Sequence, residues 1–69
     1  MPVVAQYAIK VEGRLDSTWQ AWFGELKMTY DENNNTVLTG QIDQATLHGS
    51  LKKISDLGLI ILFVERRNI

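Results

Sequence analysis

The single histidine is the natural candidate for acid–base chemistry in this sequence. His48 lies in the segment Asp-Gln-Ala-Thr-Leu-His-Gly (43–49), with Asp43 and Gln44 nearby. Histidine is the one side chain whose unperturbed pKa lies near neutrality. Catalysis would need a nucleophile or second base within hydrogen-bond reach, and the sequence identifies neither. We therefore expect a partly buried, structural His48 at the edge of a helix face, and we predict no catalytic residue.

A single arginine precedes the first predicted helix. Arg14 lies in the loop Gly-Arg-Leu-Asp-Ser-Thr (13–18), where an anion could meet the N-terminus of a helix. The loop has one glycine and an acidic residue close to the arginine, so a solvated Arg14 paired with Asp16 is the expectation. The alternative is a regulatory module of the ACT-like type. It would bind a small molecule or anion either at the Arg14 loop or at the start of the second helix, with Asp43, Gln44 and His48.

The amino-acid composition argues against several classes of function for this chain. The 69 residues include no cysteine and one histidine, so we predict no disulfide, no metal site and no cofactor. A net charge of −1 gives no reason to expect nucleic-acid binding. The longest apolar run, residues 59–64, is too short to span a membrane, and the N-terminus lacks the pattern of a signal peptide. We expect a cytoplasmic protein.

The helices and strands that position these residues are predicted from the periodicity of apolar residues and from the residues that begin and end each element. Alternation predicts a strand over residues 4–12, and a hairpin joins strands 27–31 and 36–42 across consecutive asparagines. A first helix begins at Asp16 or Ser17, and a second begins after Asp43 and ends at Gly58. The last strand is 59–65. Four large apolar residues of the first helix recur at the i, i+3, i+4, i+7 spacing of one helical face, and we expect them to anchor the core: Trp19, Trp22, Phe23 and Leu26.

This order predicts a single α+β domain over residues 1–69 with the ferredoxin-like βαββαβ arrangement. Right-handed crossovers give a four-stranded antiparallel sheet in the order 4-1-3-2, with both helices on one face. RNA-recognition domains of this shape expose aromatics on strands 1 and 3, and here strand 3 has none. Copper chaperones of this shape need a Cys-x-x-Cys pair, which is absent.

The chain resembles a group of small, uncharacterised, single-domain bacterial proteins. The resemblance rests on a G-x-L-x-x-x-W start at residues 13–19 and a D-Q-x-x-L-H-G helix at residues 43–49, and it extends over nearly the whole chain. It implies a bacterial cytoplasmic origin and carries no activity.

The last strand departs from the pattern of an ordinary monomer, because it is apolar on both sides. In the favoured register Leu59, Ile61 and Phe63 point inward, and the outward side chains are Ile60, Leu62 and Val64. A shift of one residue exchanges the two sets. The strand is also a sheet edge, which is a template for pairing with another chain. The alternative is that the N-terminal segment 1–4 or Ile69 covers it.

We therefore expect a non-enzymatic domain that associates with itself, as a homodimer, or with another protein, through strand 4 and the open sheet face. A small-molecule or anion-binding module ranks second, and an enzyme ranks third.

Overall fold

Two helices and four strands make up the computed structural model, which describes residues 3–67. Their order along the chain is β1 (Ala5–Val11), η1 (Ser17–Phe23), β2 (Lys27–Tyr30), β3 (Thr36–Ile42), α1 (Gln44–Asp56) and β4 (Ile61–Arg67). The predicted α+β class is confirmed, with boundaries that differ by one or two residues for most elements.

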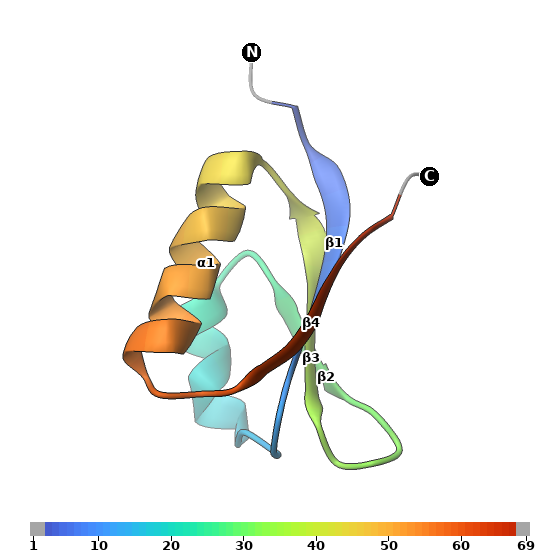
Figure 1. Cartoon of the computed structure of the whole chain (residues 1–69), viewed down its shortest axis with the longest axis vertical. Coiled ribbons are helices and arrows are strands. Elements are labelled where there is room, and N and C mark those ends of the chain that lie inside the picture. Colours follow the sequence, from blue (N-terminus) through green and yellow to red (C-terminus); the bar gives the residue numbers. More distant parts are fainter. Residues whose placement is uncertain (1–2, 68–69) are drawn as a thin grey trace.

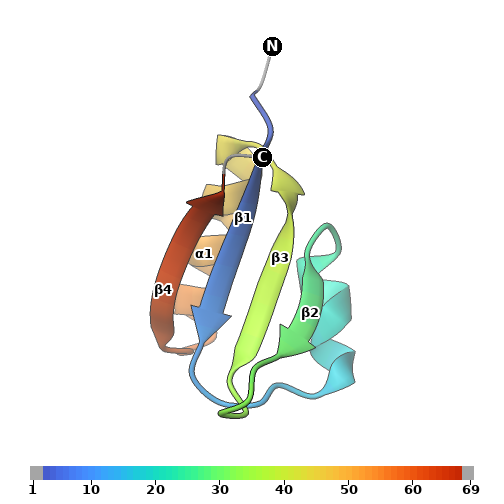
Figure 2. The same ribbon diagram turned by 90° about the vertical axis from the view of Figure 1, so that its right-hand side faces the viewer.

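The strands form one antiparallel sheet in the order β2-β3-β1-β4. Counted from the β4 edge, the same neighbours are written 4-1-3-2. Both helices pack against one face of the sheet (Figure 1), and the other face is open (Figure 2). Strands β2 and β4 are the two edges, so any contact with a further strand has to occur at one of them.

The core lies between the two central strands and the helices. Ile9 of β1 is directly opposite Leu38 of β3, and both are completely buried. Helix α1 contributes Leu47 and Ile54, which lie on the same side of the helix two turns apart. Around these residues the buried cluster is completed by Tyr7, Val11, Leu15, Phe23, Leu26 and Ile42.

The first helix is a 3₁₀ helix, and this corrects the prediction of an amphipathic α-helix. A 3₁₀ helix has three residues per turn, so Trp19 and Trp22 share a face and Phe23 lies on another. Phe23 is buried, Trp19 is half-buried against the core, and Trp22 is 54% exposed. The two indole rings lie 6.1 Å apart. The expectation that Trp22 is a core anchor is therefore wrong.

Several local predictions are confirmed by backbone geometry. Asn34 in the β2–β3 turn has a φ of 60°. Asp43 caps α1, because its Oδ1 accepts a hydrogen bond of 2.8 Å from the Thr46 N–H. Gly58, with a φ of 74°, ends the helix in a Schellman motif, and the Leu59 N–H donates to the Ile54 carbonyl at 3.1 Å.

Gly40 marks a close approach between β3 and the segment before β2. A Cβ atom at this position would lie 2.8 Å from the Glu25 carbonyl oxygen and 3.1 Å from a methyl group of Leu26. The absence of a side chain lets this segment pass directly over β3.

Candidate functional site

The Arg14 loop is tied down by its own neighbours. The Arg14 guanidinium stacks on the ring of Tyr30, 3.8 Å from the centroid, and the Tyr30 hydroxyl donates to the Leu15 carbonyl. The Leu15 N–H donates to Thr36 Oγ1 at 2.9 Å, and the Gly13 N–H donates to Asn35 Oδ1 at 3.0 Å. An anion site at a loop needs free N–H groups. Two of those offered by this loop are already used within the protein.

The residues at the start of α1 also have structural partners. The Gln44 side-chain amide donates to the Tyr7 hydroxyl at 3.0 Å. The backbone N–H and the hydroxyl of Thr46 both stabilise the Asp43 carboxylate and lower its pKa. His48 is exposed, so the expectation of a partly buried histidine is wrong. It lies about 100° around the helix from Leu47, beyond the narrow stripe by which α1 contacts the sheet.

The structure does not bring the four predicted ligand residues together. Arg14 follows the end of β1 at which Val11 pairs with Thr36, whereas Asp43, Gln44 and His48 follow Ile42, which pairs with Ala5 at the opposite end. A single ligand would have to extend along the whole of β1 to reach both. Within residues 3–67, no three acidic or histidine side chains are grouped to hold a metal ion.

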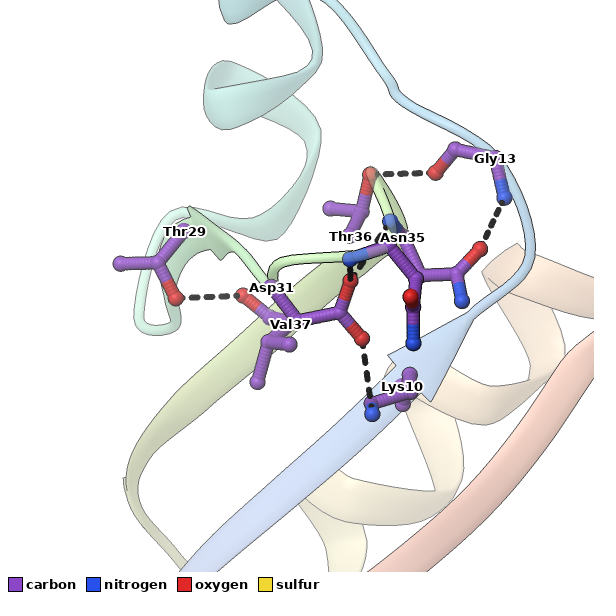
Figure 3. A network of polar contacts seen from close by, with 8 residues as sticks. Lys10, Gly13, Thr29, Asp31, Asn35, Thr36 and Val37 are labelled. Atoms are coloured by element: carbon purple, nitrogen blue, oxygen red, sulfur yellow. Dashed lines mark hydrogen bonds and ion pairs between the residues drawn. The ribbon is translucent and has the colours of Figure 1, made fainter.

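The open face of the sheet carries a network of polar contacts that sequence analysis missed (Figure 3). Lys10 Nζ lies 2.8 Å from Asp31 Oδ2, and Asp31 Oδ1 accepts hydrogen bonds from the N–H groups of Asn33 (2.8 Å) and Asn35 (2.9 Å). These donors, Lys10 above all, lower the pKa of Asp31. The network holds the β2–β3 turn against β1, and its two charges neutralise each other.

Beside this network lies a shallow hollow of about 250 Å³, lined in part by Lys10, Asp31 and Phe63. The Lys10 ammonium sits 5.0 Å from the centroid of the Phe63 ring. Lys10 thus contacts a carboxylate and an aromatic face at once. This arrangement connects β4 to the turn across the open face.

Strand β4 is the most unusual surface of the described chain, since each of its seven residues is exposed. The exposed fractions of its four consecutive apolar side chains are similar: Ile61 37%, Leu62 45%, Phe63 41% and Val64 42%. Ile60, directly before the strand, is 59% exposed. Side chains on both faces of this strand therefore remain accessible to water.

The register of β4 differs from both predicted alternations. Val64 is opposite the buried Ile9, on the helix face, whereas Phe63 is opposite Lys10, on the open face. The register shifts at the next step, so that Ile61 rather than Leu62 is opposite Val11. This β-bulge inserts one extra residue and breaks the strict alternation that sequence analysis assumed. Ile60, Leu62 and Val64 are all exposed, yet they are not one outward row.

The opposite edge of the sheet is closed by a side chain. Gln20 of η1 accepts a hydrogen bond of 3.0 Å from the Met28 N–H and donates one of 2.6 Å to the Leu26 carbonyl. Strand β2 is also only four residues long. Short edges and edges covered by a neighbouring element are two ways in which proteins prevent further strand pairing. The β2 edge has both, and β4 is long and apolar.

These features define a class: a small α+β domain with two helices on one face of a four-stranded antiparallel sheet and an accessible apolar edge. The chain belongs to the family described as Domain of unknown function (DUF8691), whose model matches residues 6–65. The matched segment contains both motifs of the predicted resemblance. Comparisons with curated proteins and with solved structures gave no match. No helix of residues 3–67 is long and apolar enough to cross a membrane.

Proposed function

We propose that this domain works by protein association through the β4 edge and performs no catalysis. The observation that carries the proposal is the run of four consecutive apolar side chains on an uncovered seven-residue edge strand. Contiguous exposed apolar surface usually marks an interface. An uncovered edge also offers a row of backbone donors and acceptors to an incoming strand.

The energetics indicate that apolar contacts and strand pairing must act together. Full burial of a large aliphatic side chain contributes about 1.5–3 kcal/mol, and these side chains are already more than half buried. Covering the rest of four side chains contributes roughly 4 kcal/mol. This equals only the lower end of the association cost of about 4–15 kcal/mol. A partner that adds a strand to β4 supplies the hydrogen bonds that make up the difference.

The chain's own N-terminal segment does not act as the cover within the described residues. Val3 is 71% exposed and Val4 is 55% exposed, and the chain before β1 extends away from the sheet (Figure 2). The remaining residues of the predicted cover, 1–2 and 69, lie outside the described residues. In this proposal the β4 edge is therefore covered by a partner protein.

We further infer a ferredoxin-like topology and a bacterial, cytoplasmic protein. The topology is supported by the β-helix-β-β-helix-β order with β1 and β3 in the centre. The origin is supported by the resemblance of residues 13–19 and 43–49 to small bacterial proteins.

Sedimentation velocity over a range of chain concentrations tests the association. The wild type should form a dimer or larger species, and Leu62→Lys should shift it to the monomer because a charge then faces the interface. Val3→Lys is the matched control, because Val3 is an exposed aliphatic residue outside β4. A wild type that stays monomeric up to millimolar concentration, with metabolites that raise its melting temperature, would instead support the small-molecule module.

A further inference from the structure

We propose that the partner at the β4 edge is a second copy of this chain, and that two β4 strands pair antiparallel about a two-fold axis at Phe63. This inference rests on the proposed function and specifies its geometry. The result would be a continuous eight-stranded sheet, because each four-stranded sheet contributes β4 as its edge.

Symmetry leaves only a few possible registers. In a two-fold interface the same surface of both copies is used, so one residue of β4 must lie opposite itself. Directly opposite residues in antiparallel strands point to the same face of the sheet. An axis between two residues would place an open-face side chain opposite a helix-face side chain. The axis must therefore pass through a residue.

The charges of β4 exclude its C-terminal half as the axis. An axis at Glu65 would set two carboxylates directly opposite each other, and an axis at Arg66 or Arg67 would do the same with two guanidinium groups. Like charges directly opposite each other destabilise a strand pair. The strand's own ion pair, with Arg67 Nε 3.4 Å from Glu65 Oε1, lies at the exposed end and is preserved when the axis lies nearer the apolar residues.

The bulge excludes Leu62 as the axis. Leu62 has no partner in the β1 ladder, and an axis there would place two bulges opposite each other. Ile61 is the first residue of β4, so an axis there would leave most of the strand without a partner. The remaining choices are Phe63 and Val64. With the axis at Val64, each Phe63 would lie opposite Glu65 of the second copy, and the bulge would lie opposite Arg66. Both contacts set an apolar side chain against a charge.

An axis at Phe63 sets apolar residues opposite apolar residues at the axis and at the next position on either side. The first charge, Glu65, then lies opposite Ile60, which is outside β4. Two Phe63 rings meet on the open face, which is a favourable cross-strand pair. Val64 lies opposite the bulge residues Ile61 and Leu62 on the helix face. Each ring is already flanked by Lys10 of its own chain, 5.0 Å from the centroid, and that charge is balanced by Asp31 at 2.8 Å. The structure thus favours Phe63 as the residue on the axis.

Disulfide trapping tests this register directly, because the chain has no native cysteine. Opposite residues have Cα atoms about 4.5–5.5 Å apart, which suits a disulfide. Phe63→Cys should therefore cross-link to itself on mild oxidation. At about 10 µM chain, a millimolar effective concentration within the dimer makes this roughly a hundredfold faster than random collision. Val3→Cys measures the collision rate, and Glu65→Cys tests the neighbouring position on the same face.

A second pair of variants covers the case in which loss of the Phe63 ring prevents dimerisation. Leu62→Cys and Val64→Cys should cross-link to each other when mixed, and each alone should remain near the collision rate. Self-linking of Val64→Cys or Glu65→Cys in a chain that sediments as a dimer would overturn this register and leave the proposed association intact. A dimer with no cross-link at any of these positions would do the same. A monomeric wild type would overturn both.

Discussion

Lys10 and Phe63 lie opposite each other across the β1–β4 pair, with the ammonium 5.0 Å from the ring centroid on the open face of the sheet. This contact places Phe63 outside the core, although alternation from Leu59 would put it inside. The reason is the shift between Phe63 and Ile61, where Leu62 is the extra residue. The inserted residue thereby places Phe63 on the open face and Val64 on the helix face, and both side chains remain exposed.

Substitutions in η1 should separate core residues from surface residues. Phe23 is 3% exposed and Trp22 is 54% exposed, although they are adjacent in sequence. Phe23→Ala should cost about 3–5 kcal/mol and unfold much of so small a domain. Trp22→Ala should cost less, about 1–2 kcal/mol, because the indole is half exposed and its main contact is the Trp19 ring. Urea denaturation followed by circular dichroism measures both.

The contrary result would also be informative. If Trp22→Ala lost as much stability as Phe23→Ala, the indole would have to be buried, as an α-helix over the same residues would place it. A normal melt for Phe23→Ala would contradict the core described for residues 3–67.

Predictions from short sequence signals succeeded where the signal is local. The cap at Asp43 and the left-handed residues Asn34 and Gly58 each depend on a few neighbouring residues, and each is present. Each of these positions has a residue type that satisfies a specific backbone requirement.

The predictions from sequence were wrong where the repeat of the backbone differs from the regular one that was assumed. The stripe Trp19, Trp22, Phe23 assumes 3.6 residues per turn, and the chain folds with three. The alternation in β4 assumes a period of two, and the bulge breaks it at Leu62. Neither change is encoded by a glycine or proline at the site. The Lys10–Asp31 pair was missed for another reason: its residues are 21 positions apart, and Asp31 follows β2, which is not a neighbour of β1 in the sheet.

Acid should reveal the contribution of Asp31. Its pKa in the folded protein is lowered from 3.8 by Lys10 and by the N–H groups of Asn35 and Asn33. A lowered folded pKa means that the carboxylate stabilises the fold above the unfolded value, and that this stability is lost as the pH falls through the folded pKa. Asp31→Asn should therefore be less stable than the wild type at neutral pH, and the difference should shrink below about pH 4.

Thermal melts from neutral to acidic pH measure this difference. Glu32→Gln is the control, because Glu32 is an exposed carboxylate in the same turn. Asp43, whose pKa is also lowered, is present in each of these proteins and contributes equally to their acid sensitivity. A difference between wild type and Asp31→Asn that stays constant down to the lowest pH would contradict a role for the ionised carboxylate.

The two edges of the sheet lead to the last prediction, which concerns Gln20. Its amide group makes two hydrogen bonds along the β2 edge, to Met28 N–H (3.0 Å) and to the Leu26 carbonyl (2.6 Å). Gln20→Ala should cost about 1–3 kcal/mol, since each bond contributes about 0.5–1.5 kcal/mol. It should also speed hydrogen exchange at the Met28 amide and open a second edge to strand pairing. Gln41→Ala, an exposed glutamine on β3, is the matched control and should leave both quantities near the wild type.

Light scattering on the double variant Gln20→Ala, Leu62→Lys then separates the two edges of the sheet. In this variant β4 is blocked by charge, so renewed association must use β2. Unchanged Met28 exchange in Gln20→Ala would mean that the side chain does not close that edge.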